Sequence, residues 1–150
     1  HSWHAALRNK SDTVMRALGK TGGMLGFSIY PHHLKDGSDC SLDSFCNMIA
    51  GAAEVMGVDN IGIGTDLCQD QPDSIVEWMR VGRWTKSIDY GEGSASNAGF
   101  PPMPNWYKDN RDFENITKGL HTIGMTKQDT DKIMGGNWLR FYDASFGSTP

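Results

Sequence analysis

Four residues of this chain carry side chains that could act together in hydrolysis: His1, Arg8, Tyr30 and Asp66. A neutral imidazole binds zinc, and a carboxylate can take the proton of a metal-bound water. A guanidinium is a fixed cation, and a phenol can donate and accept hydrogen bonds. This set of residue types suits a metal-dependent hydrolase.

Asp66 ends the stretch GVDNIGIGTD, which has the composition of a short buried strand. Side chains alternate between the two faces of a strand. The alternation puts Ile61, Ile63 and Thr65 on one face and Gly62, Gly64 and Asp66 on the other. Because glycine in a strand marks a close approach to the backbone, we expect the glycine face to be the floor of an active site. Alternatively, Asp66 caps the turn that follows.

The elements that must position these residues form a strand–helix–strand unit. Residues 24–30 are an apolar run bounded by Gly23 and Pro31, and a helix capped by Ser41 continues to Gly57, directly before the second strand. An earlier helix is predicted from Ser11 to the glycines at 22 and 23. Short connections make the two strands parallel neighbours. Ligands of such sheets lie beyond the carboxyl ends of the strands, where Tyr30 and Asp66 fall and where a preceding strand would deliver His1.

The rest of the chain has a loop-rich middle and a helical end. Between residues 67 and 110 only 73–80 has helical periodicity, and the Gly-, Ser- and Pro-rich stretch 91–104 lies among aromatic residues. We expect this segment to be a long loop that packs against the rest of the protein. Its aromatic residues would fill space there, or they would line the substrate mouth or a subunit interface in a homo-oligomer. Further helices are predicted over 111–123, after Thr126, and over 136–144. The proposed apolar anchors of the last helix are Trp138, Leu139, Phe141 and Tyr142.

Composition excludes several classes of partner. The 150-residue chain has a formal charge of −4 and no run of basic residues, which argues against nucleic acid or an anionic membrane surface. No apolar stretch approaches the roughly 20 residues that span a bilayer. The three cysteines, at positions 40, 46 and 68, lack CxxC spacing, which predicts reduced thiols and favours a cytoplasmic protein. Because the sequence begins at His1 without a methionine, we expect a fragment.

Several segments resemble the membrane dipeptidase (renal dipeptidase) family of metallopeptidases, especially its bacterial members. The opening HS with the RN at Arg8, the segments TGGMLGFSIYP and GVDNIGIGTD, and the closing IMGGNWLRFY are similar to the family in order and spacing. The resemblance implies that residues 1–150 are the C-terminal portion of a single (β/α)8 TIM-barrel domain. They would hold the end of strand six, strands seven and eight, and their helices, with the N-terminal strands absent.

The resemblance also implies an activity, zinc-dependent hydrolysis of dipeptides with two zinc ions in the intact enzyme. By position, His1 would be a metal ligand, Arg8 would hold the carboxylate of the substrate, and Tyr30 would contact the substrate. Asp66 would be the acid/base residue that handles the proton of the attacking water. The other metal ligands of the family have no counterpart here, so we expect the chain alone to be inactive.

Two other functions stay open. One is a different TIM-barrel metal-dependent amidohydrolase acting on a lactone, amide or ester, and the other is a non-catalytic truncated piece. At the level of residues, His1 could be solvated and Arg8 could form a surface ion pair. The remaining histidines are expected to be structural or exposed: His4, His32, His33 and His121.

Overall fold

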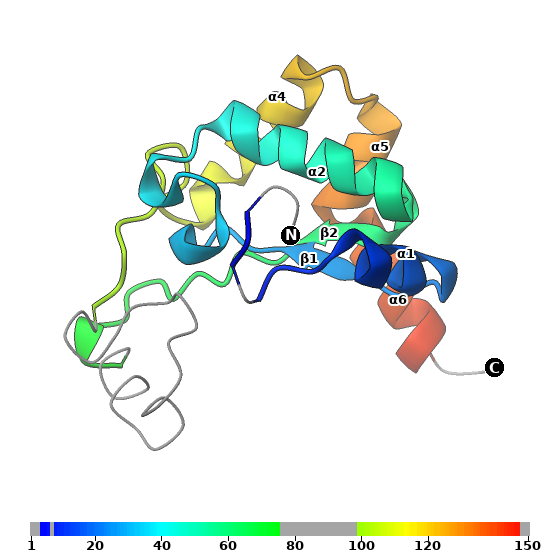
Figure 1. Cartoon of the computed structure of the whole chain (residues 1–150), viewed down its shortest axis with the longest axis horizontal. Helices are drawn as coiled ribbons and strands as arrows, with labels where there is room; N and C mark the ends of the chain where they lie inside the picture. The colour runs from blue at the N-terminus through cyan, green and yellow to red at the C-terminus, as the bar shows by residue number, and fades with distance from the viewer. Residues whose placement is uncertain (1–3, 7, 76–98, 148–150) are drawn as a thin grey trace.

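The computed structural model describes residues 4–6, 8–75 and 99–147, and at their centre is a strand–helix–strand unit (Figure 1). Strands β1 (Leu25–Phe27) and β2 (Ile61–Ile63) are parallel neighbours, with Gly26 opposite Gly62. Helix α2 (Leu42–Met56) connects them. The predicted parallel pairing is confirmed.

Helix α2 begins and ends where its sequence signals predict. The Ser41 side chain accepts a hydrogen bond from the amide of Ser44, and Gly57 ends the helix with a φ of 88°. Glycine is favoured in that backbone conformation because glycine has no Cβ. The apolar side of the helix faces the sheet and is buried at Phe45, Cys46, Ile49, Ala52 and Met56.

The strands are shorter than predicted. Within 57–66, a 3-10 turn (η3, Val58–Asn60) precedes the three residues of β2, and β1 covers three of the seven residues in 24–30. Backbone hydrogen bonds between the two segments nevertheless continue past the ends of the strands. The Gly64 amide donates to the Phe27 carbonyl at 3.0 Å, and the Ile29 amide donates to the Thr65 carbonyl at 3.1 Å. The two segments therefore stay side by side up to Ile29 and Thr65.

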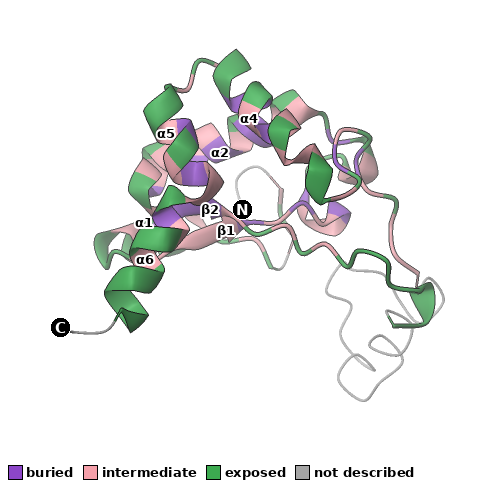
Figure 2. Cartoon of the chain, turned by 180° about the vertical axis from the view of Figure 1, so that it is seen from behind, coloured by how far each residue is buried: buried purple, intermediate pink, exposed green. Residues whose placement is uncertain are grey.

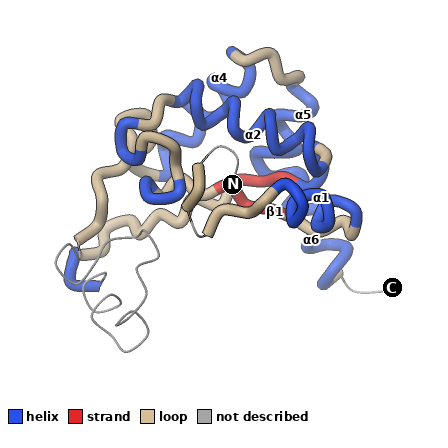
Figure 3. Tube along the Cα trace, viewed as in Figure 1, coloured by secondary structure: helices blue, strands red, loops and turns tan. Residues whose placement is uncertain are grey.

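Helices account for most of the remaining regular structure (Figure 3). Helix α1 (Asp12–Lys20) is capped by Ser11, and α5 (Lys127–Asp131) is capped by Thr126. The predicted helix over 111–123 consists of a 3-10 turn (η4, Asn110–Asp112) and α4 (Phe113–Thr122). A π turn (η5, Lys132–Gly136) joins α5 to α6 (Asn137–Phe146). Shorter 3-10 turns are η1 (Pro31–His33) and η2 (Gly37–Asp39). Of the predicted helix over 73–80, residues 73–75 are helical, and the rest lies outside the described residues.

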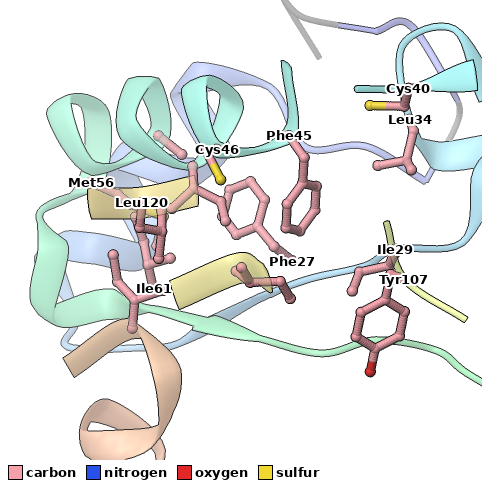
Figure 4. Packing of buried hydrophobic residues seen from close by; sticks show 14 of the residues in the cluster. Phe27, Ile29, Leu34, Cys40, Phe45, Cys46, Met56, Ile61, Tyr107 and Leu120 are labelled. Carbon is pink, nitrogen blue, oxygen red and sulfur yellow. The ribbon is translucent and has the colours of Figure 1, made fainter. Parts of the chain in front are cut away.

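The core lies between the sheet and the helices α2 and α4 (Figures 2 and 4). Ile29, Phe45 and Ile61 are fully buried there, as are Ile116 and Leu120 of α4. Helix α6 lies on the other side of the sheet (Figure 1). Because this arrangement leaves one side of α6 away from the sheet, Leu139 is 74% exposed and Tyr142 is 51% exposed. The prediction that these two residues are apolar anchors was wrong.

The three cysteines are free thiols in two different environments. Cys40 and Cys46 are buried, and Cys68 is exposed. Burial, aided by the Asp43 carboxylate and by Cys40, raises the pKa of Cys46 to about 12. The helices in the described part of the chain are all too short or too polar to cross a membrane.

Candidate functional site

Tyr30 and Asp66 leave the same edge of the sheet on neighbouring segments. Among the described residues, the hydrogen bond from the Ile29 amide to the Thr65 carbonyl is the last backbone hydrogen bond between the two segments, and each residue of the pair directly precedes a candidate site residue. Tyr30 is half-buried before the turn η1, and Asp66 is exposed. The sequence prediction that both residues reach the carboxyl edge is therefore consistent with the backbone. Their chemical roles stay predictions.

Asp66 has a left-handed backbone conformation, with a φ of 56°. Residues other than glycine adopt positive φ rarely, and aspartate tolerates it better than most. The turn is supported by Thr65, whose Oγ1 accepts a hydrogen bond from the Leu67 amide at 3.3 Å. The direction of Asp66 is thus set by this turn and not by strand alternation, since β2 ends at Ile63.

The glycine face of the sheet is covered at its amino-terminal half by the C-terminal helix. A Cβ placed on Gly62 would lie 2.7 Å from Cδ1 of Trp138, and one on Gly26 would lie 3.2 Å from the same ring. The Trp138 indole Nε1 donates a hydrogen bond to the Ile63 carbonyl at 3.0 Å. The prediction that Gly62 leaves room for substrate was wrong, because the space is filled by an indole. Gly64 differs, because the nearest atoms to a Cβ there are backbone atoms of Gly26, the first of them at 3.4 Å.

The loop after β1 is organised around Ser28. Its Oγ accepts a hydrogen bond from the Tyr30 amide at 3.0 Å and lies 3.0 Å from Nδ1 of His33. The Tyr30 ring makes edge contacts with the rings of His32 and His33, at centroid distances of 5.5 and 5.3 Å. His33, expected to be structural or exposed, therefore helps to place Tyr30. Ser28 lies before Pro31 and His33 lies after it. This placing of a hydroxyl and an imidazole on either side of a proline was the sequence signal that could have indicated their contact.

Arg8 lies next to the same loop. Its neighbour Asn9 donates from Nδ2 to the carbonyls of His4 and His33, both at 3.0 Å. Arg8, Ser28 and His33 line a cavity of about 230 Å³ between α1, β1 and α2, and its lining is mostly apolar. Asp66 does not line this cavity. The structure thus brings Arg8 to the loop after β1, with Asp66 at the end of the neighbouring segment.

The described residues do not form a metal centre. Within residues 4–6, 8–75 and 99–147, no three His, Cys, Asp or Glu side chains gather closely enough to hold a metal ion. His1, the predicted zinc ligand, lies outside the described residues. Any zinc site would therefore need ligands besides the described ones.

Comparison with known proteins assigns the chain to a family. The sequence pattern of the membrane dipeptidase family (peptidase family M19) matches residues 2–85. The chain belongs to this family. No curated protein matches the chain.

Two solved structures share the fold. An amidohydrolase from Pseudomonas aeruginosa is 29% identical, with a TM-score of 0.82, and the match covers 98% of this chain and 43% of that one. A dipeptidase AC, described as a metallopeptidase of family M19, is 14% identical, with a TM-score of 0.70 over 99% of this chain and 36% of that one. The chain therefore spans less than half the length of either structure, and it matches part of an amidohydrolase-like α/β fold.

Proposed function

We propose that the intact protein is a zinc-dependent dipeptidase and that this chain supplies part of its active site. The observation that carries the proposal is the shared sheet edge, where Tyr30 and Asp66 leave adjacent parallel segments and Arg8 lies beside the loop after β1. Carboxyl edges of this kind hold the ligands of α/β sheets and barrels. Membership of the membrane dipeptidase family supports the same reaction.

Each site residue of this chain has a distinct role in the proposal. Arg8 binds the C-terminal carboxylate of the dipeptide through its planar array of donors, and Tyr30 contacts the substrate. The oxygen of a water molecule adds to the peptide carbonyl carbon while the Asp66 carboxylate takes a proton from that water. Asp66 then gives this proton to the leaving amine nitrogen as the C–N bond breaks. His1 is this chain's proposed zinc ligand, and the remaining ligands belong to the rest of the intact protein.

The binding role of Arg8 can be tested with matched substrates. In the intact protein, Arg8→Ala should raise KM by roughly tenfold or more for a dipeptide with a free C-terminal carboxylate, because a charge-assisted hydrogen bond is lost. The KM of the C-terminally amidated dipeptide should change far less. Equal effects on both substrates would contradict a carboxylate-binding role.

The chain alone should not hydrolyse dipeptides. It offers one predicted zinc ligand, whereas catalytic zinc sites use about three protein ligands. The measurement is Ala-Ala hydrolysis by the purified 150-residue chain beside the intact protein, each with and without a chelator. Chelator-sensitive turnover by the chain alone would overturn this expectation.

A second candidate function is hydrolysis of another amide, lactone or ester by the same residues. It is favoured by the description of the P. aeruginosa structure as an amidohydrolase. A substrate panel with the intact protein separates the two candidates. A kcat/KM for lactones or esters well above that for dipeptides would favour the second.

A further inference from the structure

Asn9 connects the segment that carries Arg8 to the loop that carries Tyr30. Its Nδ2 donates one hydrogen bond to the His4 carbonyl and one to the His33 carbonyl, both at 3.0 Å. An amide nitrogen has two hydrogens, so both donors of this side chain are used. The bond to His33 spans 24 positions in the sequence. Asn9 therefore holds together two segments that are far apart along the chain.

The backbone on the Arg8 side forms a turn closed by hydrogen bonds. The Asn9 amide donates to the Ala6 carbonyl at 3.0 Å. The Lys10 ammonium donates to the Arg8 carbonyl at 2.6 Å. Arg8 lies inside this turn, directly before Asn9. Because consecutive Cα atoms are held at a fixed distance, the contacts of Asn9 also restrict the Cα from which the Arg8 side chain extends.

The loop on the Tyr30 side is closed by hydrogen bonds as well. The His33 amide donates to the Tyr30 carbonyl at 2.9 Å. The Ser28 Oγ accepts from the Tyr30 amide and lies 3.0 Å from Nδ1 of His33. The carbonyl to which Asn9 donates thus belongs to a loop whose shape is already restricted. A single side chain therefore connects the turn of Arg8 to the loop of Tyr30.

We propose that Asn9 is a positioning residue for the binding of the substrate carboxylate, because it holds Arg8 at a fixed place beside the Tyr30 loop. This inference rests on the roles proposed for Arg8 and Tyr30 in binding the dipeptide. A guanidinium that binds a carboxylate through two parallel hydrogen bonds must be placed accurately, since a displacement weakens both bonds. A residue that supports the guanidinium from behind affects binding without touching the substrate.

The first test replaces Asn9 in the intact protein. Asn9→Ala should raise KM for a dipeptide with a free C-terminal carboxylate roughly threefold to tenfold and leave kcat almost unchanged, because Arg8 is present but misplaced. KM for the C-terminally amidated dipeptide should change far less. Asn9→Leu keeps the size of the side chain but has no donor, and it should give the same result. An unchanged KM in both variants, or an equal rise for both substrates, would overturn the proposal.

Asn115→Ala is the matched control for a general loss of stability. The Asn115 Nδ2 also donates to a main-chain carbonyl, that of Trp106 at 2.8 Å, and the residue lies on α4, which carries no proposed site residue. This variant should lower the melting temperature about as much as Asn9→Ala and leave KM for both dipeptides unchanged. An equal rise in KM for the two variants would mean that lost stability, and not the position of Arg8, weakens binding.

A double variant tests whether Asn9 acts through Arg8. In an Arg8→Ala background, Asn9→Ala should raise KM for the free-carboxylate dipeptide little further, because the residue that it positions is already absent. Effects that multiply fully in the double variant would contradict an action through Arg8.

Hydrogen exchange separates this proposal from the binding role of Arg8. In Asn9→Ala the His33 amide, which donates to Tyr30, should exchange roughly tenfold faster, whatever substrate the enzyme takes. If Arg8→Ala weakens both dipeptides equally while exchange at His33 accelerates in Asn9→Ala, the carboxylate-binding role fails and the connection through Asn9 stands. If exchange at His33 is unchanged, the connection through Asn9 fails.

Discussion

The two ends of strand β2 are built differently. At its amino end, Asn137 is buried and donates from Nδ2 to the carbonyls of Val58 and Ile61, both at 2.8 Å. Nearby, Lys132 forms an ion pair with Asp59 at 2.8 Å. Beyond its carboxyl end, Asp66 is exposed and left-handed.

The difference assigns stability of the fold to the amino end of β2 and the proposed chemistry to the carboxyl edge. At the amino end, buried polar groups have partners and a Trp138 indole fills the glycine face, as expected of a region that holds the fold together. At the carboxyl edge, the Asp66 side chain is exposed and its backbone has a positive φ of 56°, a conformation that is common at functional sites. Substitutions at the amino end should change the free energy of unfolding, and substitutions at the carboxyl edge should change activity.

The largest effect is expected for Asp66→Asn. The change keeps the shape of the side chain but removes the proton acceptor, so kcat of the intact enzyme should fall by about 10²–10⁴. Urea denaturation should show the same free energy of unfolding as the unmodified protein. A near-normal kcat would mean that Asp66 caps its turn and has no catalytic role.

Gly62→Ala should be the most destabilising substitution at the amino end. The new methyl group would overlap the Trp138 ring, and overpacking of this kind costs about 1–3 kcal/mol, with this site at the upper end. Gly64→Ala is the control, since its methyl group would make ordinary contacts, and it should cost less than about 1 kcal/mol. The free energies come from urea denaturation, and similar values for both variants would contradict the packing described for Trp138.

Asn137→Ala should cost about 2 kcal/mol of unfolding free energy. It removes two hydrogen bonds and leaves the buried Ile61 carbonyl without this donor. Asn47→Ala is the control, because Asn47 is exposed and its Nδ2 donates within α2, to the Asp43 carbonyl. Its effect should stay within about 0.5 kcal/mol. The same denaturation measurement tests both, and a ranking in the reverse order would count against the buried Asn137 contacts.

The smallest effect is expected from chemical modification of the Cys68 thiol at the carboxyl edge. In the native chain a thiol reagent should label exposed Cys68 quickly and Cys46 only after unfolding, because burial and a raised pKa suppress the reactive thiolate. Labelled Cys68 should leave the melting temperature unchanged. Fast labelling of Cys46 in the folded chain would contradict the packing of α2 on the sheet.

The local signals in the sequence predicted much of the fold. The caps at Ser11, Ser41 and Thr126 placed three helix starts correctly, because a capping hydroxyl acts on an amide three residues along. The spacing of apolar residues identified the buried face of α2, and the short connections predicted parallel strands. The order of the family-like segments indicated the membrane dipeptidase family, which the comparison with known proteins confirmed.

Whether the glycine face of the sheet is open or covered was decided by the tertiary structure alone. Trp138 reaches Ile63 across 75 positions in the sequence, so no local pattern could show that an indole covers Gly62. The left-handed turn at Asp66 likewise replaces the alternation that a longer strand would have imposed. Alternation and capping act between near neighbours and are written in the sequence, whereas the filling of space depends on which distant side chains the fold brings together.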